Sequence, residues 1–505
     1  MRSGGGTVVL FPFMAQGHIN PFLDLARRLS SHLPPPLTIT IISTQANIIN
    51  LRPRFHSYPT IHFAEIAFEN PVQNTDSLSS LAAIARFYRT AESHLQLPFR
   101  HLIGEITRSS GGKPPLCIIS DMFLGFTVDV AHEFGSKHVP FYTSGPYAMS
   151  IYNCIWTHFP HLQLKTANAG NEGEEDDIIP LPGLLHVTIR RSQLSNNMKA
   201  ADPVNDPTSL NTKRQAEYCS RADGSLWNTL EVLEKTSLDE WGRKTGKPVW
   251  AIGPLLPSSK QGYERGGKQP TLSPQICIDW LNLQSDNSVL YVSFGSQNSI
   301  PCAQMIQLAK WLEQSGKAFI WVLRNPTGID VNEEFKPEWL PEGFEDRMRE
   351  TGMGLIVRNW APQIEILEHR SVGAFLSHCG WNSVLESLSR GVPIIGWPLG
   401  SEQYYNVKLL EEELGVCMEV ARGYDAKIDS GEMADKVKMA LGGKKGMEMK
   451  RKAEALSAEM KKAVEADADT KGTSLRALED FVETLLRWDD ENNEGSSNSD
   501  MVTEV

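Results

Sequence analysis

Residues 360–403 read WAPQIEILEHRSVGAFLSHCGWNSVLESLSRGVPIIGWPLGSEQ, and this stretch decides the fold class. Within it, the apolar run at residues 372–377 predicts a buried strand, and the HCG sequence at residues 378–380 predicts a tight turn. Leucines then recur at helical spacing over residues 381–391, where a glycine ends the pattern. A strand, a glycine turn and a helix in this order indicate an α/β unit.

The predicted helix start at this turn is suited to binding an anion. Its first backbone N–H groups lack partners within the helix, and the helix dipole favours negative charge there. Asn382 and Ser383 add side-chain donors, and His378 adds a donor or, if protonated, a charge. Glu386 lies one turn further along, where its carboxylate can accept hydrogen bonds from ribose hydroxyls if phosphates occupy the helix start.

Apolar runs alternate with helical patterns on both sides of this stretch, which predicts parallel sheets covered by helices on both faces. The strands expected in the first half are residues 7–13, 37–44, 116–121 and 138–144, and the last of these closes the series. The run at residues 249–255, just before the expected linker, is also strand-like. The strands expected in the second half are residues 288–296, 318–324, 354–360, 372–378 and 392–398.

These two series predict two domains of the α/β class. The first spans residues 1–257, and a segment rich in Gly, Ser, Lys and Pro at 258–274 is the expected linker. The second spans residues 275–488, and its last helix is free to pack back on the first domain. Residues 489–505 are acidic and polar, which is typical of a disordered tail.

Residues 360–403 resemble the C-terminal signature of plant family 1 UDP-glycosyltransferases, and the HCGWNS core at 378–383 carries the match. The resemblance implies the GT-B fold, in which two Rossmann-like parallel-sheet domains face each other across a cleft. It implies that the N-terminal domain binds a small acceptor and that the C-terminal domain binds most of a UDP-sugar donor.

The resemblance also implies a role for each donor-site residue. The Trp360 ring would stack on uracil, and the Ala361 backbone would pair with its edge. Gln363 and Glu386 would hold the ribose. The diphosphate would be held by His378, Asn382, Ser383 and Ser296, and the sugar by Trp381, Glu402 and Gln403. Glutamine at position 403 resembles members that transfer glucose, whereas histidine there resembles those that use galactose.

A base and its carboxylate partner are expected at two strand ends of the first domain. His18 follows the strand at residues 7–13, and Asp121 ends the strand at 116–121. Because ligands bind at the carboxyl edge of a parallel sheet, both groups face that site. A carboxylate beside an imidazole orients the ring and stabilises its protonated form. In the resembled family the base is a His in such a QGH loop and its partner an Asp after the later strand, and Thr143 matches a position that contacts the donor sugar.

These residues predict an inverting transfer of a hexose to a hydroxyl of a small acceptor. Preorganised dipoles would stabilise the departing diphosphate, so neither a metal nor a cofactor is expected. The acidic cluster at residues 172–177 is interpreted as a solvated loop rather than a metal site.

Other classes of protein fit the sequence less well. The net charge of -12 argues against binding to nucleic acid or to an anionic membrane surface. The turn around Gly17 lacks the GxGxxG pattern that a nicotinamide-dependent oxidoreductase requires. An animal-type membrane glucuronosyltransferase would need a signal segment and a C-terminal span, and neither is recognised here. A non-catalytic nucleotide-sugar binder remains the alternative.

The acceptor is the least determined feature. Loops of the first domain would form a largely apolar pocket suited to a flavonoid, another phenolic or a terpenoid. Phe87, Phe123, Tyr147 and Trp156 are candidates for its lining and equally for the core. Seven cysteines without a metal-site spacing predict free thiols, and a monomeric cytoplasmic enzyme is expected.

Overall fold

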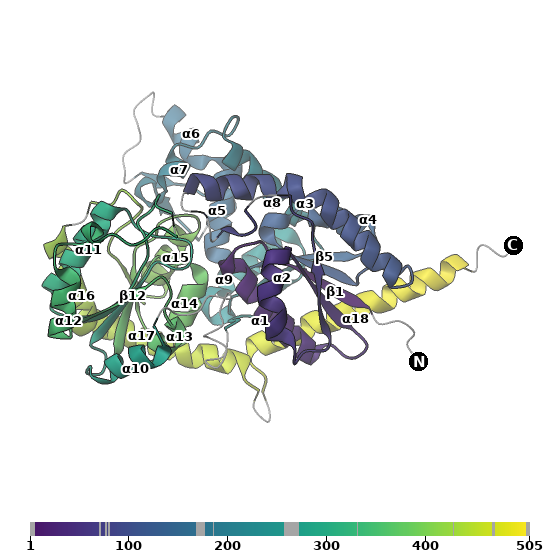
Figure 1. Cartoon of the computed structure of the whole chain (residues 1–505). Helices are drawn as coiled ribbons and strands as arrows, with labels where there is room; N and C mark the ends of the chain where they lie inside the picture. Colours follow the sequence, from purple (N-terminus) through teal and green to yellow (C-terminus); the bar gives the residue numbers. More distant parts are fainter. Residues whose placement is uncertain are drawn as a thin grey trace.

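The computed structural model describes residues 6–69, 72–75, 78, 81–167, 177–184, 186–256, 272–330, 332–427, 429–466 and 470–500. Two lobes, each built around a parallel sheet, lie side by side (Figure 1). Most of the expected linker at 258–274 and of the acidic cluster at 172–177 lies outside the described residues.

The N-terminal sheet has the strand order β3-β2-β1-β4-β5-β8-β9, and every neighbouring pair is parallel. Its strands are β1 (Thr7–Phe11), β2 (Thr38–Ser43), β3 (Ile61–Glu65), β4 (Cys117–Asp121), β5 (Lys137–Tyr142), β8 (Ser225–Trp227) and β9 (Val249–Ala251). The order reverses between β1 and β4, which is the point where doubly wound sheets bind ligands.

The N-terminal domain contains nine α-helices among the described residues before the linker, and several of them cover the two faces of this sheet (Figure 1). They are α1 (Gln16–His32), α2 (Gln45–Leu51), α3 (Leu81–Ser109), α4 (Thr127–Glu133), α5 (Pro146–His158), α6 (Pro160–Ala167), α7 (Asn196–Lys199), α8 (Pro207–Ser220) and α9 (Glu231–Thr245). A short antiparallel pair, β6 (Ile178–Ile179) and β7 (Ile189–Arg190), lies between α6 and α7 in the chain.

The C-terminal sheet is also parallel throughout, with the order β12-β11-β10-β13-β14-β15. Its strands are β10 (Val289–Ser293), β11 (Ala318–Leu323), β12 (Gly354–Arg358), β13 (Val372–Ser377), β14 (Ile394–Gly396) and β15 (Cys417–Glu419). Its helices are α10 (Pro274–Asn282), α11 (Cys302–Ser315), α12 (Phe344–Thr351), α13 (Gln363–Glu368), α14 (Trp381–Leu388), α15 (Gln403–Lys408), α16 (Ser430–Gly442) and α17 (Lys444–Val464).

The last helix, α18 (Thr473–Asp500), crosses from the C-terminal lobe to the N-terminal sheet (Figure 1). Its apolar side chains join the core beneath β9 and α1, including Leu478, Phe481 and Leu485. The helix continues through Asp500, past residue 489 where a disordered tail was expected. The first turns of α18 are held by packing on the N-terminal sheet. Because helix propagation adds to an existing helix and no proline interrupts residues 489–500, the helix continues through this polar stretch.

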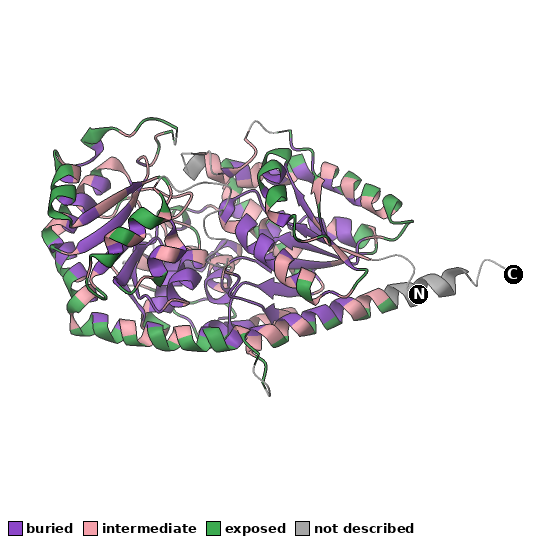
Figure 2. Ribbon diagram, turned by 60° about the horizontal axis from the view of Figure 1, so that its bottom comes forward, coloured by how far each residue is buried: buried purple, intermediate pink, exposed green. Residues whose placement is uncertain are grey.

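The sheets match the expected α/β pattern, and each set of strands is buried between helices (Figure 2). The first series does not close at residues 138–144, because β8 and β9 extend the sheet. β9 lies within the strand-like run at residues 249–255, whereas β8 has only three residues, too few for a periodic pattern to show. Within the described residues, no helix combines the length and the apolar character needed to span a bilayer.

Candidate active site

A cavity of about 910 Å³ opens between the two domains. The predicted site residues that line it are His18, Thr143, Ser296, Trp360, Ala361, Gln363, His378, Trp381, Asn382, Ser383, Glu386, Glu402 and Gln403. Asp121 lies behind His18 and is fully buried. The switch point of each sheet therefore faces the same cavity, one from either side.

His18 is held by its neighbours at one ring nitrogen. Its Nδ1 lies 2.7 Å from Asp121 Oδ2 and 3.3 Å from Thr143 Oγ1. The other carboxylate oxygen, Asp121 Oδ1, accepts from the backbone N–H of Phe123 at 3.0 Å. With the carboxylate as acceptor, Nδ1 carries the proton and Nε2 is left to take one from a molecule in the cavity.

The surroundings of His18 act on its pKa in opposite directions. Burial alone would lower the pKa, but the charge of Asp121, the hydrogen bond to it and the charge of Glu402 together raise it above the ordinary 6.5. The ring retains 17% exposure, so it is open to the cavity. These properties suit a general base near neutral pH.

Aromatic rings form the wall next to His18. The Phe123 ring centroid lies 5.3 Å from that of His18, and Tyr88 packs between Phe123 and Phe13 at 4.8 and 4.5 Å. Of the four aromatic candidates from the sequence, Phe123 lines the cavity. The other three, Phe87, Tyr147 and Trp156, are buried in the core instead. Tyr88 and Tyr152 face the cavity, because α3 and α5 turn those positions inward.

The turn after β13 brings His378 between two glycines. A Cβ at Gly295 would lie 2.7 Å from His378 Cε1, and one at Gly380 would lie 2.5 Å from Nε2. Gly295 also has a φ of 81°, which favours glycine. Burial lowers the pKa of His378 to about 4, so the ring is neutral at pH 7. A neutral ring can donate one hydrogen bond into the cavity, which is one of the two possibilities left open by the sequence.

Gln363 and Glu386 form one hydrogen-bonded network at the C-terminal side of the cavity. Gln363 Nε2 donates to Glu386 Oε2 at 2.7 Å, and the Tyr291 hydroxyl donates to Gln363 Oε1 at 3.2 Å. Ser383 Oγ lies 3.4 Å from the same Gln363 nitrogen. Glu386 is fully buried, and Gln363, itself held by Tyr291, restrains its carboxylate.

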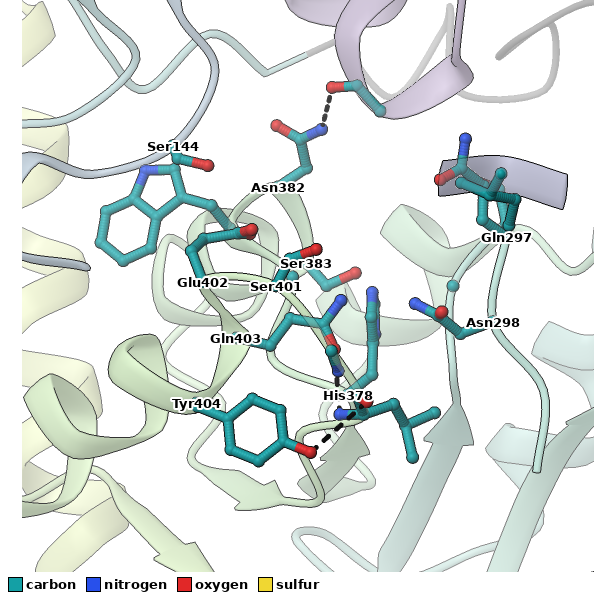
Figure 3. Close-up of a pocket in the computed structure, with 18 of the residues that line it drawn as sticks. Ser144, Gln297, Asn298, His378, Asn382, Ser383, Ser401, Glu402, Gln403 and Tyr404 are labelled. Carbon is teal, nitrogen blue, oxygen red and sulfur yellow. Dashed lines mark hydrogen bonds between the residues drawn. The ribbon is translucent and has the colours of Figure 1, made fainter. Parts of the chain in front are cut away.

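Gln403 is the first residue of α15 and Glu402 its N-cap residue, and both line the cavity. Gln403 Oε1 accepts from the backbone N–H groups of Leu399 and Gly400, both at 3.0 Å. Burial raises the pKa of Glu402, although the charge of His18 and a hydrogen bond from Ser144 oppose the shift. Figure 3 shows Ser144, Glu402 and Gln403 around one region of the cavity.

Comparison with known proteins identifies the family of this chain. A family model described as "UDP-glucoronosyl and UDP-glucosyl transferase" matches residues 263–437. UDP-glycosyltransferase 92A1 of Arabidopsis thaliana is 37% identical over 95% of this chain and 97% of its own. Crocetin glucosyltransferase 3 of Crocus sativus is 37% identical over 87% of this chain and 91% of its own.

This chain belongs to the UDP-glycosyltransferase family. A Glycyrrhiza uralensis member solved with glycyrrhetinic acid 3-O-monoglucuronide superposes with a TM-score of 0.81, at 27% identity over 99% of both chains. A Medicago truncatula member solved with UDP-glucose gives a TM-score of 0.75, at 25% identity over 95% of this chain and 98% of its own. The chain is thus a UDP-glycosyltransferase with the GT-B fold, as the resemblance implied.

Two further residues of this UDP-glycosyltransferase line the cavity and were not expected from the sequence. Gln297 and Asn298 follow Ser296 in the turn after β10 (Figure 3). Gln297 donates to the Thr75 hydroxyl of the other domain, and Asn298 accepts from Tyr424 at 3.1 Å. The sequence could have indicated these two residues, because they directly follow Ser296, a predicted phosphate-binding residue. Among the described residues, no cluster of His, Cys, Asp or Glu is arranged to bind a metal.

Proposed function

We propose that this UDP-glycosyltransferase transfers glucose from UDP-glucose to a hydroxyl of a small lipophilic acceptor, with inversion at the anomeric carbon. The observation that carries the proposal is the His18–Asp121 pair, which faces the predicted donor residues across one cavity. Glutamine at position 403 and the glucosyltransferases among the relatives, such as crocetin glucosyltransferase 3, support glucose as the sugar.

In the proposed reaction, His18 Nε2 removes the proton of the acceptor hydroxyl. The oxygen forms a bond to the anomeric carbon from the side opposite the diphosphate, and the bond from that carbon to the diphosphate oxygen breaks. UDP leaves with the electron pair, and Asp121 stabilises the imidazolium. No metal or cofactor has a role, because neutral donors at the start of α14 would stabilise the leaving group.

The donor would lie along the C-terminal domain. Trp360 and Ala361 would hold uracil, and Gln363 with Glu386 would hold the ribose. His378, Ser383, Ser296 and the N-terminal turn of α14 would hold the diphosphate, with Glu402 and Gln403 at the sugar and Thr143 near it. The relatives support a lipophilic acceptor, because named members act on scopoletin and on an anthocyanin. The aromatic wall of Phe123 and Tyr88 would bind an aromatic ring by stacking.

The test is release of UDP by purified protein, with UDP-glucose, UDP-galactose and UDP-glucuronate crossed against phenolic, flavonoid and terpenoid acceptors. We expect acceptor-dependent release that favours UDP-glucose. His18→Ala should lower turnover at least about 100-fold, because the base is removed. His132→Ala, an exposed histidine outside the cavity, is the matched control and should leave turnover unchanged. UDP-sugar binding without any turnover would favour a non-catalytic nucleotide-sugar binder.

A further inference from the structure

Two consecutive residues at the start of α14 donate hydrogen bonds to the other domain. Trp381 Nε1 donates to the main-chain oxygen of Asn228 at 2.8 Å. Asn382 Nδ2 donates to the main-chain oxygen of Gly17 at 2.7 Å, the bond drawn from Asn382 in Figure 3. Both acceptors belong to the N-terminal domain, so the anion-binding turn is tied to it at two points.

The bond from Asn382 reaches the residue directly before the proposed base. The carbonyl of Gly17 and the backbone nitrogen of His18 belong to one planar peptide unit, so fixing the carbonyl restrains the main chain of His18. The ring of His18 is restrained separately, by Asp121 at Nδ1. His18 is therefore held by its own domain at the ring and by the donor-binding domain at the backbone.

We propose that Asn382 is a positioning residue, which sets the distance between His18 on one domain and the donor's anomeric carbon on the other. The proposal rests on the proposed role of His18 as base. It differs from the role implied by the family resemblance, in which Asn382 holds the diphosphate. An in-line transfer depends steeply on such a distance, because a shift of about 1 Å can lower the rate about 100-fold.

The two roles of Asn382 predict different kinetics. For Asn382→Ala we expect kcat at saturating UDP-glucose to fall about 10-fold or more, with the Kd for UDP unchanged. Glu386→Ala is the matched control on the same helix and should raise the Kd for UDP. A raised Kd for UDP in Asn382→Ala, together with an unchanged kcat at saturating donor, would overturn the positioning role.

A series of phenols with increasingly acidic hydroxyls separates positioning from general damage to the fold. A more acidic hydroxyl needs less help from a base, so the loss of kcat in Asn382→Ala should shrink along the series, as it should in His18→Ala. A loss that stays constant along the series would overturn the positioning role alone. A wild-type protein inactive toward every acceptor would overturn the proposed function, and the positioning role with it.

Trp381→Phe provides a second variant in case Asn382→Ala folds poorly. The substitution keeps an aromatic ring at a position that is only 2% exposed, and it removes the N–H that reaches Asn228. We expect kcat to fall with the Kd for UDP unchanged, and the fall again to shrink with acidic phenols. Unchanged kcat in Asn382→Ala, or in Trp381→Phe if Asn382→Ala does not fold, would overturn the proposal.

Discussion

At the scale of single residues, two histidines of the cavity have contrasting environments, on which the proposed chemistry depends. His18 has a carboxylate partner at 2.7 Å and its pKa is raised, whereas burial lowers the pKa of His378 to about 4. The His18 ring can therefore accept a proton near neutral pH, whereas the His378 ring is neutral there. The sequence supplied both residues but not their protonation, because burial and partners arise only in the folded chain.

Replacing Asp121 with asparagine tests the origin of the raised pKa of His18. Only neutral His18 can take the acceptor proton, so wild-type kcat should rise with pH through a pKa above 6.5. Asp121→Asn removes the charge that raises this pKa, so the rise should move to lower pH. Maximal kcat should also fall about 100-fold or more, because the imidazolium is no longer stabilised.

The measurement is kcat between about pH 5 and pH 9 for wild type and Asp121→Asn, at saturating donor and acceptor. Asp223→Asn is the control, because Asp223 pairs with His132 and Lys137 outside the cavity. Its profile should match that of wild type. If the rise in Asp121→Asn stays at the wild-type pH, a group other than His18 controls the rate.

At the scale of elements, the ends of β1, β4, β10 and β13 were predictable because long apolar runs end there in polar or glycine-containing turns. The residues that form the aromatic wall next to His18 were not predictable. Tyr88 faces the cavity while its neighbour Phe87 is buried, and this difference depends on how α3 rotates against the sheet. Local spacing gives the period of a helix but not the direction of its faces in the fold.

Glu234, in the first turn of α9, is a buried carboxylate against the N-terminus of α5, and its ionisation should affect stability. Glu234 accepts from the backbone N–H of Tyr147 at 3.0 Å and from the Thr229 hydroxyl. A Cβ at Gly145 would lie 2.3 Å from the carboxylate oxygens, so the group fits tightly against the turn before α5. Burial raises the pKa of Glu234 from 4.5 to about 7.

Because this pKa is higher in the folded state than in the unfolded state, the contribution of Glu234 to the free energy of unfolding is fully present below pH 4.5. That contribution is lost as the pH rises through about 7. Glu234→Gln imitates the protonated form and removes this loss. Relative to wild type, the variant should therefore gain free energy of unfolding between pH 5 and pH 8, on the order of 3 kcal/mol.

Urea unfolding at both pH values measures this difference. Glu231→Gln, an exposed position in the first turn of the same helix, is the control and should show no such gain. The neighbouring Tyr147 phenol stays neutral over this range, because burial raises its pKa. If the free energies of unfolding of Glu234→Gln and wild type differ by the same amount at pH 5 and pH 8, Glu234 is not the group whose ionisation lowers stability.

At the scale of the whole molecule, the two domains are joined by shared packing as well as by hydrogen bonds. One hydrophobic core combines Ile151 and Ile155 of α5 with Leu385 of α14 and Tyr405 of α15. The helix α18 adds a second connection, since it leaves the C-terminal lobe and packs on β9 of the N-terminal sheet. The sequence indicated that the last helix could pack back and that residues 249–255 are strand-like, but not that the two would meet, because local patterns do not encode contacts between distant segments.

Phe481 is the residue of α18 that tests this second connection. Its ring is fully buried with its centroid 4.9 Å from that of Trp250, whose indole N–H donates to Asp480 at 2.7 Å. Phe481→Ala should destabilise the protein by about 3–5 kcal/mol, because it leaves a cavity between α18 and β9. Glu483→Ala, exposed on the same helix, should change stability little.

The loss of stability in Phe481→Ala should be confined to the N-terminal domain. The proposed donor residues lie on the C-terminal domain, and Phe481 packs in a different core, so the Kd for UDP should be unchanged in Phe481→Ala at low temperature. Thermal unfolding with and without UDP measures both quantities together, because UDP bound to the folded protein raises the midpoint according to its affinity. A midpoint that falls while the UDP-induced rise remains would show that α18 stabilises the acceptor domain without contributing to the donor site. Loss of the UDP-induced rise would instead show that the donor site depends on how α18 fixes the two domains relative to each other.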